Sequence, residues 1–167
     1  MDDACFMEMA LKEAQAALDL GELPVGCVAA VPGRVVATGA RRFSTPGKTN
    51  EMDHAEVTVL RQLSELDPPP DMDRVTVYST LEPCLMCLGA ILINGINRIV
   101  YGAEDVMGGG CGLDLSRMPP LYRDRKLTIV RGVCRDQCLA LFRRFFSRPE
   151  NEYLKNSLLA DYMVKTE

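Results

Sequence analysis

The stretch "TLEPCLMC", residues 80–87, places two cysteines three positions apart directly after a proline. A buried strand, "RVTVYST" (74–80), leads into it, and the apolar helical segment "CLMCLGAILIN" (84–94) follows. The next strand is "RIVYG" (98–102), and the order strand, helix, strand predicts parallel neighbours joined by a right-handed crossover. Because Pro83 favours a helix start, both thiols should lie on the first turn and face one point.

The rest of the sequence extends this unit into a single α/β domain with helices on both faces of its sheet. Apolar periodicity predicts further helices over residues 3–19, 54–66 and 136–146, a hairpin over 25–38, and a weaker strand over 127–133. No linker divides the chain. We expect residues 1–148 to form this domain and residues 149–167 to be a C-terminal helical extension of it.

The composition is that of a globular protein with reduced thiols. A chain of 167 residues can bury a sufficient core without disulfides, and its seven cysteines are an odd number. No apolar run reaches the roughly 20 residues that cross a membrane. The chain opens with acidic residues where a secretory signal would carry basic ones. These features predict a cytoplasmic protein with no membrane contact.

Net charge argues against a general polyanion binder, since the formal charge is -4 and the pI is near 5.1. Basic residues are nevertheless clustered at Arg41 and Arg42, at 122–126 and at 143–148. With their aromatic neighbours they could form a local basic face, although a solvated surface is the simpler interpretation.

The lone histidine, His54, stands two residues before Glu56 and about 30 before "PCLMC", which fits the H-x-E…P-C-x-x-C pattern of zinc nucleobase deaminases. One imidazole and two thiolates suit tetrahedral zinc and leave a fourth position open for water. A helix N-terminus would favour ionised Cys84 and Cys87. Glu56 cannot easily join this set, so its carboxylate is free to move a proton.

Other sites for these cysteines remain open. A redox C-x-x-C would leave the histidine and its adjacent glutamate unexplained. A closed structural zinc site would need a fourth ligand, for which Cys27 and Cys111 are candidates. Cys134 and Cys138 lie on an apolar helix face, where buried packing is the simpler interpretation. A serine hydrolase would need His54 too, and no G-x-S-x-G accompanies it.

At "HAE" and "PCLMC" the chain resembles the cytidine deaminase superfamily, and within it the bacterial tRNA adenosine deaminases and their catalytic eukaryotic counterparts. The segment "ELPVGCV" (22–28) is similar to their strand entry, and "GGGCG" (108–112) to the glycine-rich turn of the eukaryotic subunit. The resemblance runs from about residue 6 to about residue 146. It implies a three-layer α/β/α fold with a mixed five-stranded sheet.

The resemblance also implies hydrolysis of an exocyclic amine to a carbonyl, and a homodimer formed through the helices after the zinc motifs. It assigns zinc ligands to His54, Cys84 and Cys87, a proton shuttle to Glu56, and base contacts to Val25, Gly26 and the backbone around Ala55. Arg41 departs from the family, because tRNA deaminases usually carry a base-contacting asparagine there. An arginine offers donors only, so Asn50 could take this role through a small loop shift.

Three functions follow. The leading hypothesis is zinc-dependent deamination of adenosine to inosine in tRNA. Arg41, the low pI and the acidic end "SRPENEYLKNSLLADYMVKTE" (147–167) favour a second, deamination of a free base, nucleoside or nucleotide of guanine or cytosine type. A third is a non-catalytic zinc-binding partner subunit, which would have no use for Glu56.

Overall fold

The structure, a computed structural model, describes residues 2–45, 47 and 49–166. Its order of helices and strands agrees with the sequence prediction through α5 and adds three short helical turns. The elements are α1 (Asp3–Asp19), β1 (Gly26–Val31), β2 (Arg34–Ala40), α2 (Ala55–Glu65), η1 (Met72–Arg74), β3 (Thr76–Leu81), α3 (Leu85–Ile93), β4 (Arg98–Ala103), η2 (Leu115–Arg117), α4 (Pro120–Arg123), β5 (Thr128–Val130), α5 (Arg135–Phe146) and α6 (Leu158–Lys165).

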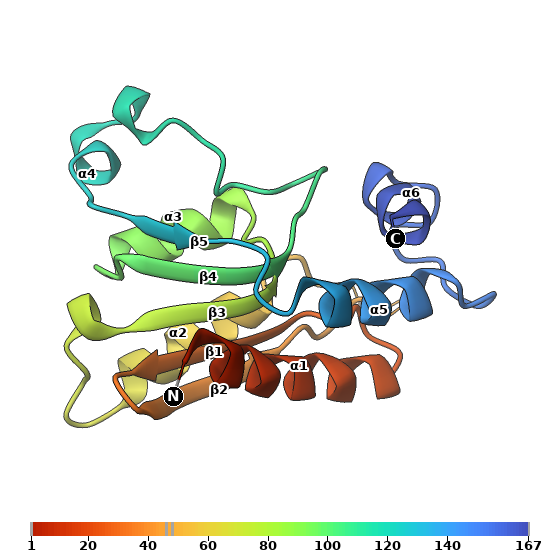
Figure 1. The fold of residues 1–167 in the computed structure, drawn as a ribbon, viewed down its shortest axis with the longest axis horizontal. Helices are drawn as coiled ribbons and strands as arrows, with labels where there is room; N and C mark the ends of the chain where they lie inside the picture. Colours follow the sequence, from red (N-terminus) through yellow and green to blue (C-terminus); the bar gives the residue numbers. More distant parts are fainter. Residues whose placement is uncertain (1, 46, 48, 167) are drawn as a thin grey trace.

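The five strands form one mixed sheet in the order β2-β1-β3-β4-β5. β1 is antiparallel to both β2 and β3, whereas β3, β4 and β5 are parallel. Figure 1 shows α1 and α5 covering one face and α2 and α3 the other. The predicted three-layer α/β/α fold and the parallel pairing across "TLEPCLMC" are therefore confirmed.

α1 packs closely on the sheet because a glycine lies beneath it. Asp2 caps the helix by accepting a hydrogen bond from the Cys5 backbone at 3.0 Å. A Cβ on Gly26 would lie only 2.0 Å from the carbonyl oxygen of Ala10 and 2.5 Å from the backbone nitrogen of Ala14. The missing side chain thus allows β1 and α1 to approach.

The predictions are least accurate after β4. Only three residues of the expected strand 127–133 pair with the sheet, and the basic stretch 122–126 begins within a short helix. Residues 151–157 contain turns where the start of the helical extension was expected, and Ser157 then caps α6 by accepting from Ala160.

Residues 149–166, called the C-terminal segment below, pack back onto the domain. Leu159 and Met163 of α6 are buried, and Figure 1 shows α6 lying beside α5. Tyr162 donates a hydrogen bond to Glu104 at the end of β4, and Arg135 of α5 holds the same carboxylate at 2.9 Å. This group joins the C-terminal segment to the sheet and to α5.

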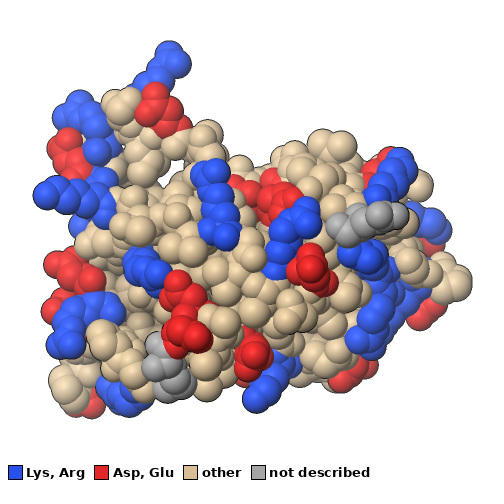
Figure 2. Space-filling view, in the orientation of Figure 1, with Lys and Arg blue, Asp and Glu red and all other residues tan. Residues whose placement is uncertain are grey.

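The basic clusters do not form one uniform surface. Figure 2 shows basic and acidic side chains interspersed on the face that it displays. The expectation that Arg41 belongs to a surface cluster is wrong, because only 2% of this residue is exposed and its guanidinium is paired with Glu51, whereas Arg42 is exposed. Among the described residues, no helix is long and apolar enough to cross a membrane.

Candidate active site

The N-termini of α2 and α3 bring the three predicted zinc ligands together. His54 is the cap residue of α2, Cys84 is that of α3, and Cys87 lies in the first turn of α3. The helix therefore begins one residue after Cys84. Nδ1 of His54 lies 3.6 Å from Sγ of Cys84 and 3.4 Å from Sγ of Cys87, and the three ligand atoms all lie within 4.8 Å of one another.

Electrostatics in this cluster favour a thiolate. A hydrogen bond from Cys87, followed by one from His54, lowers the pKa of Cys84 to about 4. The bond to Cys84 raises the pKa of Cys87, and its burial acts in the same direction. An ionised sulfur facing an imidazole is a donor set that zinc prefers, so the residues fit the metal that the sequence indicates.

The cluster has three members and not four. Within residues 2–45, 47 and 49–166, neither Cys27 nor Cys111 joins it, although both thiols are buried. The closed structural site therefore lacks its fourth cysteine in the described part of the chain. Three protein ligands correspond to a catalytic zinc site with one open position.

Glu56 lies beside the cluster in the first turn of α2. It is 3% exposed, and burial raises the pKa of its carboxyl group. Oε1 accepts a hydrogen bond from Ser79 Oγ at 3.1 Å, and Oε2 lies 3.5 Å from Sγ of Cys87. A carboxyl group with a raised pKa, held beside the metal ligands, can accept and return a proton.

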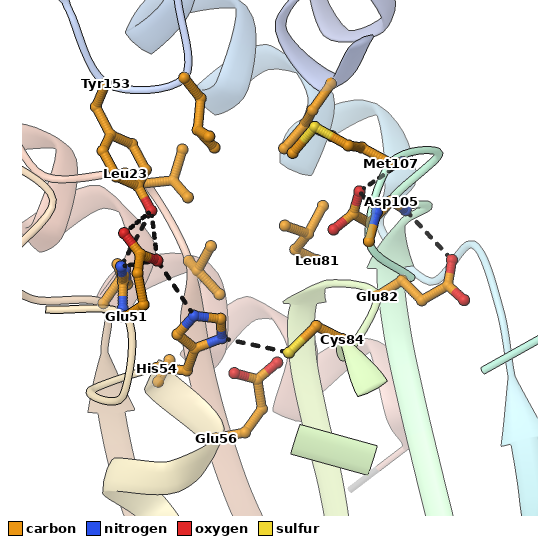
Figure 3. Close-up of a pocket in the computed structure, with 16 residues that line it drawn as sticks. Leu23, Glu51, His54, Glu56, Leu81, Glu82, Cys84, Asp105, Met107 and Tyr153 are labelled. Atoms are coloured by element: carbon orange, nitrogen blue, oxygen red, sulfur yellow. Dashed lines mark hydrogen bonds and ion pairs between the residues drawn. The ribbon is translucent and has the colours of Figure 1, made fainter. Parts of the chain in front are cut away.

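A cavity of about 210 Å³ opens above these residues. Figure 3 shows His54, Glu56 and Cys84 at its base, with Glu51 and Tyr153 on one side and Asp105 and Met107 on the other. The volume is below the roughly 300–1,000 Å³ of drug-sized sites, which suits a ligand no larger than a nucleobase with part of its sugar.

The other sequence-predicted base contacts are only partly at this cavity. Val25 and Ala55 line it. Gly26 is not among the residues that line it: its α-carbon faces α1, and its backbone nitrogen donates to Thr80 Oγ1 at 3.0 Å. Gly26 thus supports the floor without forming its surface.

One wall of the cavity is a loop, residues 105–111. In the sequence, only the glycines of this loop pointed to the family. Glu82 binds both ends of this loop, accepting from the backbone nitrogens of Asp105 at 3.2 Å and Cys111 at 3.0 Å. The backbone of Gly109 pairs with that of Cys84. The position of Glu82, one residue before the P-C-x-x-C motif, was the signal that could have identified it.

The opposite wall contains Arg41. Its Nη1 donates to the carbonyl of Asn50 at 2.9 Å, and its Nη2 donates to Glu51 Oε2 at 2.9 Å and to the Tyr153 hydroxyl at 3.0 Å. Arg41 lines the cavity, but these Nη atoms are engaged within the protein. The Asn50 amide donates to Asp53 at 2.6 Å, so it is engaged within the loop.

The C-terminal segment completes the cavity. Tyr153, Leu154 and Leu159 all line it, and the Tyr153 hydroxyl donates to the Glu51 carboxylate at 3.0 Å. Their sequence contains no motif that would have identified them. The C-terminal segment therefore lies over the site as well as on the core.

The zinc-binding region of cytidine and deoxycytidylate deaminases matches residues 1–103, more than half of the chain. The chain belongs to this deaminase family. Among curated relatives, the tRNA-specific adenosine deaminase of Bacillus subtilis is 30% identical, covering 86% of this chain and 88% of its own length. The enzyme of the same name from Agrobacterium fabrum is 34% identical, over 84% of this chain and 91% of the relative.

A solved structure described as a study of A-to-I editing by tRNA:A34 deaminases superimposes on this deaminase with a TM-score of 0.70. That chain is 31% identical, and the match covers 81% of this chain and 97% of that one. Family membership and these relatives make the protein a hydrolytic deaminase. The family's zinc-binding region also contains the histidine and both cysteines of the observed cluster.

Proposed function

We propose that the protein deaminates adenosine to inosine in tRNA. The observation that carries this proposal is the similarity to tRNA-specific adenosine deaminases, which extends over most of this chain and most of theirs. The cavity supports it, since an enzyme that acts on a base within a nucleic acid needs a narrow pocket for one extruded base.

In this mechanism His54, Cys84 and Cys87 would hold zinc. When bound, zinc supplies a Lewis acid that lowers the pKa of water to about 7. Glu56 accepts the proton of the attacking water at its carboxylate and returns it to the departing amine, so that ammonia leaves and a carbonyl remains. The hydrogen bond from Ser79 orients this carboxylate.

Apolar residues hold the base against these groups. Val25 and Ala55 would contact the ring, while Gly26 keeps the strand beneath them in place through its backbone. Arg41 has a supporting role in this arrangement, because its Nη atoms hold Glu51 and Tyr153. Burial of the base among apolar side chains also excludes bulk water from the reaction.

The placement of the C-terminal segment favours a second candidate, deamination of a free base, nucleoside or nucleotide. Tyr153 and Leu159 line the cavity, so we expect the segment to narrow the approach for a polynucleotide. A small substrate would need no such approach. The two candidates share their zinc chemistry and differ only in what reaches the cavity.

Ammonia release distinguishes these candidates. Zinc-loaded wild type and Glu56→Ala would be offered total tRNA, and separately a panel of free bases, nucleosides and nucleotides, with inosine in the tRNA measured by nucleoside analysis. Inosine formation that depends on Glu56 would support tRNA editing. Release from one small substrate alone would establish the second candidate. Equal activity in both proteins would mean that the measured activity does not come from this site.

We also propose a cytoplasmic homodimer, in which residues 149–167 belong to the same domain as the rest of the chain. An apolar groove of about 410 Å³ runs along α3, and Leu85 and Ile93 at its edge are more than half exposed. A second copy covering this face would remove these side chains from water. Light scattering should give twice the chain mass for wild type and the chain mass for Ile93→Glu.

A further inference from the structure

The two ring nitrogens of His54 face different groups. Nδ1 faces the two cysteine sulfurs at 3.4 and 3.6 Å, which directs Nε2 away from the cluster. On that side Oε2 of Glu51 lies 3.9 Å from Nε2 (Figure 3). When Nδ1 binds a metal, Nε2 carries the ring's proton, and metal-bound histidines almost always donate this proton to a nearby acceptor.

Glu51 is held in place by two other side chains. Arg41 donates to its Oε2 at 2.9 Å, and the Tyr153 hydroxyl donates to the same carboxylate at 3.0 Å. Arg41 is almost fully buried, so its charge fixes the carboxylate on this wall of the cavity. A small rotation of Glu51 within this pair would bring it from 3.9 Å to hydrogen-bonding distance of Nε2.

The other acidic side chains near His54 have different partners, and Glu56 among them is bonded to Ser79 and lies beside the sulfur of Cys87. Asp53, next to His54 in the sequence, is bonded to Arg61 at 2.9 Å and to the Asn50 amide. Asp105 and Glu82 bind backbone nitrogens of the 105–111 loop. In the described part of the chain, Glu51 is therefore the carboxylate that faces Nε2.

We infer that Glu51 is a positioning residue for the zinc ligand His54, and that Arg41 and Tyr153 hold it in this role. The inference rests on the zinc site of the proposed function. It gives the C-terminal segment a second task, because Tyr153 links this segment through one carboxylate to a metal ligand. Orientation of the imidazole and increased basicity of Nδ1 are the expected benefits.

The competing explanation is that Glu51 serves only as the counter-ion of buried Arg41. Glu51→Gln separates the two, because glutamine keeps an oxygen that can accept from Arg41 and Tyr153 but is a much weaker acceptor for the imidazole proton. A counter-ion role would lower the stability of the fold and leave the zinc affinity of folded protein unchanged. A positioning role would weaken zinc binding itself.

The experiment is a zinc competition titration against a chromophoric chelator at fixed pH, on folded full-length protein. Glu51→Gln should bind zinc about 10- to 100-fold more weakly than wild type. Tyr153→Phe, which removes the hydroxyl but no charge, should give a smaller loss in the same direction. Asp53→Asn is the matched control: it removes an equal charge one residue from His54 and should stay within about twofold of wild type.

Steady-state kinetics of the zinc-loaded proteins give a second readout, in which Glu51→Gln should lower kcat and leave KM near the wild-type value. Zinc affinity of Glu51→Gln within about twofold of wild type would overturn the role of Glu51 and leave the deaminase intact. A loss equally large in Asp53→Asn would also overturn it, since charge alone would then explain the effect. Wild type that bound no zinc would overturn the zinc site and this inference together.

Discussion

Adding one methyl group at Gly109 tests how the 105–111 loop supports the zinc site. A Cβ there would lie 2.5 Å from the carbonyl oxygen of Asp105, 2.6 Å from Cδ of Glu82 and 2.7 Å from its Oε2. Ordinary contacts begin near 3.4 Å, so the loop must move by most of an ångström. Neither group can move easily, because the Asp105 carbonyl is backbone and the Glu82 carboxylate accepts hydrogen bonds from the backbone nitrogens of Asp105 and Cys111.

The expected cost of Gly109→Ala follows from this overlap. Overfilling a packed site costs about 1–3 kcal/mol. Because Gly109 pairs with the backbone of Cys84, relief of the strain would displace a proposed zinc ligand, and 1–3 kcal/mol corresponds to roughly 5- to 150-fold in binding. We therefore expect Gly109→Ala to lose about 1–3 kcal/mol in the free energy of unfolding and at least about fivefold in zinc affinity.

Gly112→Ala is the control, because it lies just beyond the same loop and its Cβ would meet nothing within 4 Å. Urea unfolding of the zinc-loaded proteins and chelator competition measure the two quantities. Gly109→Ala that matched Gly112→Ala in both would show that the loop does not support Cys84, and would refute the reasoning.

Three further predictions concern the packing that surrounds the site. Gly26→Ala should reduce the free energy of unfolding by at least about 3 kcal/mol in urea melts, because its Cβ overlaps α1 backbone at 2.0 Å, whereas Gly89→Ala meets nothing within 4 Å and should be neutral or stabilising. The arginine at the start of α5 lowers the pKa of Glu104 to about 2, so this carboxylate stabilises the fold above the usual glutamate value near 4.5, and the contribution disappears as pH falls toward 2. Both partners are about a third exposed, so we expect Glu104→Gln to lose only about 1 kcal/mol in the free energy of unfolding at pH 7. In the same melts, the difference between wild type and variant should become smaller as the pH is lowered to 4 and then to 3. A difference that stayed constant over this range would contradict the assignment. Met163→Ala should lose about 2–5 kcal/mol by emptying a buried site in α6, and the exposed Val164→Ala much less; equal small losses would show that α6 is not docked in solution.

Local spacing explains what the sequence could predict. The order strand, helix, strand around "TLEPCLMC" determines the parallel pairing of β3 and β4, and one proline and two cysteines within five residues place both thiols at the start of α3. His54 could be added because a single histidine left no other choice. Each of these inferences depends on residues close in sequence or unique in the chain.

The walls of the cavity are formed by contacts between residues far apart in the chain, which no local sequence pattern predicts. Arg41 and Tyr153 are 112 positions apart, and Tyr153 lies in a turn where the sequence predicted part of a helical extension. Arg41 and Arg42 look equivalent in the sequence, yet one is buried and the other exposed. Charge and composition do not distinguish such neighbours, since burial is decided by the partner that the folded chain supplies.

The C-terminal segment relates these long-range contacts to the choice of substrate. Tyr153 attaches it to Glu51 on one wall of the cavity, and Tyr162 attaches it to Glu104, the neighbour of Asp105 on the other. If RNA is the substrate, we expect its flanking nucleotides to meet the C-terminal segment, whereas a free base would occupy only the cavity. Loss of the Tyr153 hydroxyl should therefore affect the two kinds of substrate differently if RNA is the natural one, because only the RNA has flanking nucleotides that meet the segment. Arg41 bonds to both Glu51 and Tyr153, so we expect its replacement to disturb this wall of the cavity for either kind of substrate.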